Sequence, residues 1–141
     1  MTPHRSYCPV NLIVEIIGDK WTFLILRDII FYKRRHFNVL LRLSEEGIAS
    51  NILRDRLAML EKEGLLTKTK DPNDSHKQKL RYSLTDKCID LLPMMLDAIS
   101  WSIRYMPVDQ AKYKPAIDLS QAGPETVAAF RKALSDAHLI P

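Results

Sequence analysis

The sequence predicts a mainly α-helical fold with one small β-hairpin. Two observations carry this prediction: apolar residues recur at helical spacing as far as Gly64, and two short segments around a polar turn, residues 65–70 and 79–84, have the pattern of paired strands. Helical spacing then returns after Thr85. With 141 residues, 46% of them hydrophobic and 27% charged, the chain is long enough for one compact domain plus an appended arm.

The first two predicted helices are unusually apolar. One begins at Pro9, which suits the first helical position, and ends at Gly18. It has two apolar stripes: Val10, Ile13, Val14 and Ile17, and Leu12 with Ile16. The next helix, residues 21–31, is capped by Asp19 and apolar nearly all round. Each apolar side of such a helix must be buried against another element, so we expect a second subunit to bury one of the two sides.

Two further helices precede the predicted hairpin. A basic turn, residues 33–36, leads into a short helix that begins near Phe37 and is closed by Gly47. The following helix covers residues 50–62, with a stripe of leucines on one side. Spacing of 100° per residue places these residues opposite the leucines: Asn51, Arg54, Asp55, Ala58 and Lys62.

The remainder of the chain is predicted to be helical. Thr85 caps a long helix that runs to about Tyr105, and Pro93 is expected to kink it. Its apolar residues have near-heptad spacing, which is typical of a helix that packs against another helix. Prolines then separate this helix from an amphipathic segment at residues 125–139.

This order of elements is that of a winged helix-turn-helix, in which the helix before the hairpin enters the DNA major groove. We predict a DNA-binding and dimerisation domain over residues 1–106, dimerised through its N- and C-terminal helices. Residues 107–141 are predicted to form a C-terminal arm with one amphipathic helix. The formal net charge of +4 favours an anionic partner without requiring nucleic acid.

The polar face of the fourth helix has residue types that suit base reading. Asparagine can pair bidentately with adenine and arginine with guanine, so Asn51 and Arg54 are the expected base readers. Asp55 would repel phosphates unless it accepts a hydrogen bond from cytosine or holds Arg54 or Arg56 in place, which is the interpretation we favour. An ordinary solvated helix face looks similar, but the hairpin that follows favours DNA binding.

Two basic clusters flank this helix and are predicted to contact phosphates. The predicted DNA-binding residues are Ser50, Asn51, Arg54 and Arg56 of the helix, Arg34 and Arg35 of the basic turn, and Lys77, Lys79 and Arg81 of the hairpin. A lysine-rich hairpin can also serve only to protect a sheet edge. The alternative function is therefore a winged-helix module for protein contacts without DNA specificity, whose basic face would meet an acidic partner.

Other classes of protein are disfavoured. No nucleophile elbow, phosphate loop, metal-ligand spacing or converging carboxylate pair is present, so neither an enzyme nor a cofactor is expected. Residues 1–10 lack the apolar region of a signal peptide, and no run approaches the ~18 apolar residues of a membrane span. We therefore expect a cytoplasmic, nucleoid-associated protein with no membrane partner.

Motifs spread from Cys8 to Trp101 resemble those of the HxlR family of bacterial winged-helix regulators, in the MarR-like superfamily. The motifs include CPV at residues 8–10, GDKWTFLILRD at 18–28, FN at 37–38, GI at 47–48, LEKEGL at 60–65, YSLT at 82–85 and LLP at 91–93. The resemblance implies a homodimer that binds a partly palindromic operator and regulates neighbouring genes. We expect repression. The resemblance also implies that Cys8 stands where some members of the family sense electrophiles or oxidants.

The resemblance and the residues together define two further expectations. Ala49 stands where the family usually has a capping serine, so Ser50 is expected to take over capping. The Cys8 thiol lies at the start of a helix, which lowers a thiol pKa, and Arg5 and His4 would act in the same direction. We hypothesise that a small electrophile or oxidant modifies Cys8 and shifts the dimer between two DNA-binding geometries. A cysteine without a signalling role is the alternative.

Overall fold

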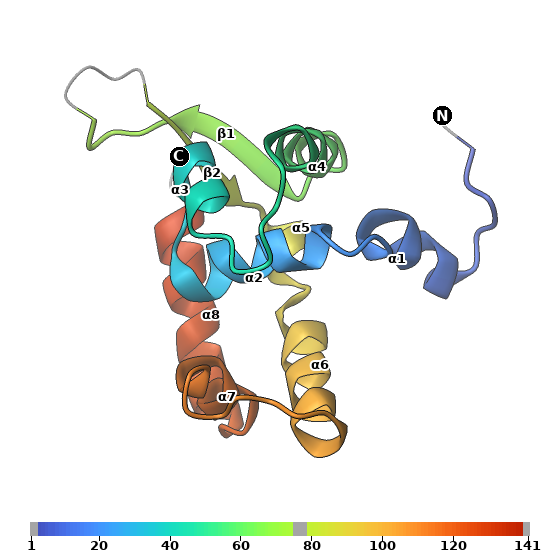
Figure 1. The fold of residues 1–141 in the computed structure, drawn as a ribbon, viewed down its shortest axis with the longest axis vertical. Helices are drawn as coiled ribbons and strands as arrows, with labels where there is room; N and C mark the ends of the chain where they lie inside the picture. Colours follow the sequence, from blue (N-terminus) through green and yellow to red (C-terminus); the bar gives the residue numbers. More distant parts are fainter. Residues whose placement is uncertain (1–2, 75–78, 140–141) are drawn as a thin grey trace. The chain divides into compact units, whose positions relative to one another are not determined.

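The computed structural model describes residues 3–74 and 79–139. Its elements are α1 (Pro9–Ile17), α2 (Thr22–Tyr32), α3 (Phe37–Arg42), α4 (Ser50–Lys62), β1 (Leu66–Lys70), β2 (Leu80–Leu84), α5 (Asp86–Ile89), α6 (Leu92–Tyr105), α7 (Lys114–Ser120) and α8 (Pro124–His138) (Figure 1). They form two compact units, Met1–Ser83 and Leu84–Pro141. The predicted mainly helical fold with one hairpin is confirmed. The hairpin residues His76 and Lys77 lie outside the described residues.

The first unit is built around α2 and α4. Ile25, Leu26 and Ile29 of α2 are buried, and so are the three leucines of α4. Helix α4 packs against both α3 and β1, and Figure 1 shows α4 beside the hairpin. The predicted fourth helix has the bounds expected from the leucine stripe, because a period of 3.6 residues persists from Ser50 to Lys62.

Close contacts explain why the first helix stops where it does. A Cβ atom on Gly18 would overlap the carbonyl oxygen of Val14, so the chain can turn tightly only with glycine there. Asp19 then accepts hydrogen bonds from the backbone N–H groups of Trp21 and Thr22, at 2.8 and 3.0 Å, and from Thr22 Oγ1 at 2.6 Å. Burial raises the pKa of Asp19, but these hydrogen bonds and nearby Arg56 outweigh burial and lower it overall.

The C-terminus of α4 is closed by a glycine in the left-handed conformation. Gly64 has φ of 75°. Its N–H bonds to the carbonyl of Glu61, and the N–H of Leu65 bonds to the carbonyl of Leu60. This pair of bonds is the Schellman arrangement, and it directs the chain from α4 into β1.

Gly64→Ala is therefore expected to destabilise the fold. A Cβ in the left-handed region costs roughly 1–2 kcal/mol, and no neighbouring atom lies within 4 Å of its position to add a clash. Urea unfolding should show a lower free energy of unfolding by about 1 kcal/mol with an unchanged denaturant slope. Gly64→Asn is the control, because asparagine adds a Cβ at the same open position but adopts the left-handed conformation far more readily than alanine. Equal stability of Gly64→Ala and wild type would contradict the role given to this glycine.

The second unit differs from the sequence prediction in two places. Instead of one helix kinked at Pro93, α5 ends at Ile89 and α6 begins at Leu92, so the predicted single helix is wrong. Pro93 lacks an N–H group and its ring would clash with the carbonyl of Ile89, four residues earlier, so it starts a new helix instead of bending an old one. Thr85 caps α5 as predicted, accepting a hydrogen bond from the Cys88 N–H at 3.3 Å.

The C-terminal arm contains two helices and not the single one predicted. Helix α7 packs against α6, and α8 packs against α5. Helix α7 has only seven residues, too few for a helical period to be read from sequence. The buried side chain of His138 accepts a hydrogen bond at Nδ1 from the Leu84 N–H, at 3.0 Å, which ties α8 to the start of its own unit. Within the described ranges, no helix is long and apolar enough to cross a membrane.

Candidate nucleic-acid interface

The polar face predicted for α4 is exposed to solvent. Exposed residues are Ser50, Asn51, Arg54, Asp55, Ala58 and Lys62, while Leu53, Leu57 and Leu60 are buried on the opposite side. The N-terminal half of this face therefore presents an amide, a guanidinium and small side chains together. These are groups that can make hydrogen bonds to base edges and approach them closely.

The capping role expected of Ser50 is wrong. Ala49 occupies the N-cap position with extended backbone, and Ser50 is the first helical residue. Neither Ala49 nor any other described side chain caps α4. The turn before α4 uses Ser44 instead, whose Oγ accepts a hydrogen bond from the Ile48 N–H at 3.1 Å. The Ser50 hydroxyl is thus not committed to capping.

The arginine that Asp55 was expected to hold is held elsewhere. Arg56 Nη1 lies 3.6 Å from Asp19 Oδ2, on the turn between α1 and α2. Asp55 has no ion pair within the described residues, so the preferred interpretation of Asp55 as a clamp for Arg54 or Arg56 is wrong. The reason is geometric: Arg56 points from the edge of α4 toward the preceding helices, away from the face that carries Arg54 and Asp55.

The basic turn is attached to the hairpin through Arg35. Helix α2 ends at Tyr32, and the chain reverses at the next residue, Lys33, which has a left-handed φ of 57°. The carbonyl oxygen of Arg35 accepts a hydrogen bond from the Tyr82 N–H, at 2.7 Å. Its side chain donates two more: Nε to the Tyr82 carbonyl oxygen at 2.9 Å, and Nη2 to Ser83 Oγ at 2.6 Å. Burial lowers the pKa of Arg35, and the charge of Arg81 lowers it further. Arg35 is thus half-buried at the base of the hairpin.

A second attachment joins His36 to the hairpin. His36 Nε2 lies 2.8 Å from Asp71 Oδ2, and Asp71 Oδ1 accepts the Asn73 N–H at 2.9 Å. The Asn73 N–H and the His36 ring hold the pKa of Asp71 below its ordinary value. Two side chains of the basic turn therefore fix the position of the hairpin relative to the helix-turn-helix.

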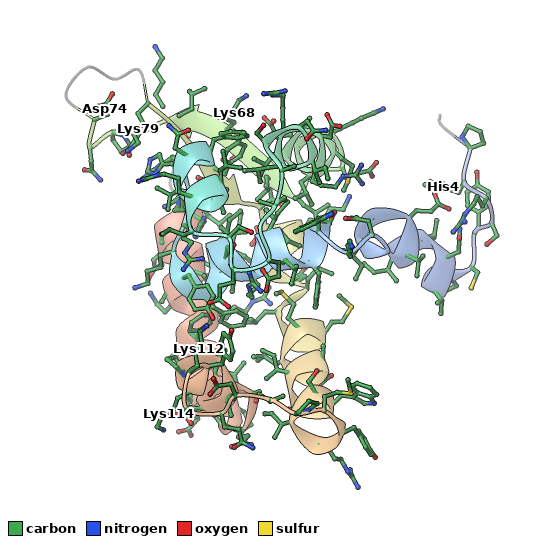
Figure 2. The ribbon with its side chains drawn as sticks, in the orientation of Figure 1. His4, Lys68, Asp74, Lys79, Lys112 and Lys114 are labelled. Carbon is green, nitrogen blue, oxygen red and sulfur yellow. The ribbon has the colours of Figure 1, made fainter. Side chains whose placement is uncertain are left out.

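The described part of the hairpin has three exposed cations, Lys68, Lys70 and Lys79. Figure 2 shows Lys68 on β1 and Lys79 at the far end of the hairpin, and both are exposed. Arg81 is half-buried, and its Nε has no hydrogen-bond partner. Lys68 was not among the predicted DNA-binding residues, although the alternation of threonine and lysine in β1 could have indicated it. Lys77, also predicted to bind DNA, lies outside the described residues.

A network of charges links α2 to the turn before α4. Arg27 forms a two-point contact with Glu46, and Asp28 accepts from Arg27 Nε at 2.9 Å. Arg34 donates to the carbonyl of Leu43 at 3.0 Å and lies over the Tyr32 ring. Burial lowers the pKa of Arg27, but the two carboxylates more than compensate and raise it overall. Arg34 was predicted to contact DNA, whereas no sequence pattern singled out Arg27.

Comparison with known proteins identifies the family. Residues 16–110 match the HxlR-like helix-turn-helix family, which is more than half of the chain. The chain belongs to this family. The resemblance of the GDKWTFLILRD and LEKEGL motifs to HxlR proteins is thereby confirmed.

Relatives of this HxlR-like chain are named as regulators. The HTH-type transcriptional regulator Rv3095 of Mycobacterium tuberculosis is 35% identical over 98 residues, covering 70% of this chain and 59% of Rv3095. The HTH-type transcriptional regulator YdeP of Bacillus subtilis is 32% identical over 118 residues, covering 82% of this chain and 80% of YdeP. The chain thus spans about three fifths of the mycobacterial relative. The family and these relatives are transcriptional regulators and not enzymes.

Solved structures confirm the winged helix-turn-helix fold of the HxlR-like chain. The crystal structure of PA1607, assigned as a transcription factor, aligns with a TM-score of 0.64 and 30% identity over 74% of this chain and 70% of that one. The reduced form of the transcriptional regulator YodB from B. subtilis aligns with a TM-score of 0.56 and 20% identity, over 71% and 95% of the two chains. At that identity the likeness to YodB shows the fold alone.

The two cysteines of this HxlR-like chain have opposite environments. Cys8 is exposed immediately before α1, and the backbone N–H groups of Asn11 and Val10 lower the pKa of its thiol. Arg5 and His4 were expected to lower the pKa of the Cys8 thiol as well, but they have other partners. Arg5 donates to the Asn11 side chain, and His4 pairs with the carboxylate of Glu15.

Cys88, by contrast, is buried in the second unit, and burial raises the pKa of its thiol to about 12. A thiol with that pKa is almost entirely protonated at neutral pH, so it is a poor nucleophile. Of the two cysteines, only Cys8 is placed to react with a molecule from solvent.

Proposed function

We propose that the chain is a sequence-specific, DNA-binding transcription regulator that acts as a homodimer on a partly palindromic operator, with α4 in the major groove. The observation that carries the proposal is the exposed polar face at the start of α4, beside a hairpin with exposed lysines. The proposed sign of regulation is repression, and the proposed location is the cytoplasm, in association with the nucleoid.

The proposed contacts fall into two groups. Asn51 and Arg54 read base edges, with Ser50 available for a further hydrogen bond. Phosphate contacts are proposed for Lys77, Lys79 and Arg81, since these cations follow α4 in the chain. The phosphate contact predicted for Arg34 stays a prediction without support from the contacts, because its guanidinium donates to the carbonyl of Leu43.

Arg35 and Arg56 take a different role in this proposal from the one their charge first indicated. Both have guanidinium atoms directed at other parts of the same unit: Arg35 at the hairpin, Arg56 at Asp19. We assign them to positioning the DNA-binding elements. Direct phosphate contacts by either residue remain a prediction without support from the contacts.

The homodimer is supported by apolar side chains that a single chain leaves in water. Val10 on α1 is 68% exposed, and Trp101 on α6 is 57% exposed. Helix α1 has no buried residue although its sequence is apolar on two sides. Two copies related by a two-fold axis would present two α4 helices to half-sites about one DNA turn, ~34 Å, apart.

Selection of binding sites from a random duplex library tests the proposal, followed by footprinting of the enriched sequence and sedimentation equilibrium of the free protein. We expect one enriched sequence with two related halves and the mass of a dimer. Failure to enrich any duplex, together with binding to an acidic protein surface, would favour the alternative of a winged-helix module for protein contacts.

Cys8 is proposed to be the site at which a small electrophile or oxidant changes DNA binding. A quinone serves as the probe, because its ring carbon can accept the Cys8 thiolate. One C–S bond forms, the ring takes up the electron pair and a proton, and no other reactant is needed. The thiol has the features required: it is exposed and its pKa is lowered by two N–H groups. The fold is also that of YodB, for which reduced and diamide-treated forms have been solved.

Treatment with a quinone is expected to change affinity for the selected duplex about tenfold, in the usual range of coupling between two sites. Fluorescence anisotropy before and after treatment measures it, and mass spectrometry locates the adduct. Cys8→Ser should abolish the response, while Cys88→Ala should retain it. Equal affinities of treated and untreated wild type, with Cys8 fully modified, would rule out the sensor.

A further inference from the structure

Charged side chains of α2 hold the turn between α3 and α4, residues 43–49. We infer that Arg27 and Glu46 form a positioning pair for base reading: they set the direction in which the first turn of α4 leaves this loop, without touching DNA. The inference rests on the proposed DNA-binding function. It gives a role in specificity to two residues outside the surface that would contact DNA.

The contact between the two side chains is a fork. Arg27 Nη1 lies 2.8 Å from Glu46 Oε2, and Arg27 Nη2 lies 2.9 Å from Glu46 Oε1. Two parallel N–H···O bonds between planar groups fix both distance and orientation, which a single bond or a lysine would not do. The loop is therefore attached to α2 with a defined angle.

The arginine is itself fixed. Its Nε donates to Asp28 Oδ1 at 2.9 Å, so all three guanidinium nitrogens are engaged. The Asp28 side chain is only 5% exposed and also lies 3.6 Å from Arg34 Nη1. Arg34 in turn donates to the carbonyl of Leu43, at the beginning of the same loop. The start of the loop at Leu43 and its middle at Glu46 are thus both connected to one buried carboxylate on α2.

The position of this loop determines where α4 begins. Only Gly47, Ile48 and Ala49 separate Glu46 from Ser50, and Ile48 is buried. Helix α4 has no side-chain cap at its N-terminus, so its first turn depends on how the loop is held. Bidentate base contacts tolerate errors of only ~0.5 Å. A loosened fork would therefore reduce base discrimination before it reduced general affinity for DNA.

Glu46→Gln is the test, with Glu45→Gln as the matched control. Both variants remove one negative charge from the same loop, so their effects on non-specific phosphate attraction should be equal. Only Glu46→Gln replaces one acceptor of the fork by a donor. The measurement is the ratio of affinities for the duplex selected by wild type and for a scrambled duplex. Hydrogen exchange of loop peptides in the free protein gives a readout that does not depend on DNA.

We expect Glu46→Gln to lower the affinity ratio about tenfold, as the loss of a charge-assisted hydrogen bond implies, and to speed exchange in the loop. Glu45→Gln leaves the fork in place, so it should keep the affinity ratio at the wild-type value. Equal ratios in the two variants would overturn the inference and leave the proposed function intact. A Glu46→Gln protein with a lower melting temperature but an unchanged ratio would overturn it too, because the fork would then serve stability alone. A wild type that selects no sequence would overturn the proposed function, and the inference with it.

Discussion

Arg54→Ala is expected to weaken binding to the selected duplex by about 5- to 150-fold and to relax the preference at one base pair, because a bidentate contact contributes about 1–3 kcal/mol of discrimination. Arg54 lies on the exposed face of α4, opposite the buried leucines, so the substitution should leave the free energy of unfolding unchanged. Titrations against the selected duplex and its single-base variants measure the effect.

Arg54→Lys keeps the positive charge at this position but removes the planar guanidinium that can make two parallel hydrogen bonds. Lysine keeps the attraction to phosphates but is a point charge, so we expect the base preference to relax while the slope of affinity against salt stays at its wild-type value. If Arg54 bound only phosphates, the two substitutions would leave the base preference unchanged. In that case Arg54→Ala would weaken binding equally on all sequences and reduce the salt slope by about 1.

The elements of the first unit could be predicted because local patterns determine them. A leucine stripe at helical spacing and a glycine at its end define α4, and a change to alternating residues defines the hairpin. The second unit was less predictable. Pro93 is compatible with a kinked helix and with the first turn of a new one, and the choice depends on packing that the local pattern does not contain.

The roles of the arginines could not be separated from sequence. Arg35 and Arg54 are both cations in or beside the helix-turn-helix, yet Arg35 bonds to Tyr82 and Ser83, which are 47 and 48 residues away. Such contacts between distant positions leave no periodic signal. Residue type indicates that a guanidinium will bind oxygen atoms. Only the fold decides whether these belong to the protein or to a ligand.

Leu53→Ala should produce a large loss of stability, because its side chain is part of the core face of α4. Leu53 is 0% exposed, and removing a leucine side chain from a packed core costs about 2–5 kcal/mol through lost burial and the cavity that remains. Domains of this size are stable by only about 5–15 kcal/mol, so a substantial unfolded fraction at 37 °C is expected. Urea unfolding at fixed protein concentration measures the change, because dimerisation would otherwise alter the midpoint.

Leu80→Ala is the matched control, since it deletes the same atoms from a side chain that is 43% exposed on β2. We expect a loss of stability below about 1 kcal/mol there. A comparison with Arg54→Ala is equally informative, because Leu53 and Arg54 are neighbours in sequence on opposite faces of one helix. Leu53→Ala should lower stability, and Arg54→Ala should lower specificity at unchanged stability. Similar losses of stability from both substitutions would mean that α4 does not divide into a core face and a DNA face.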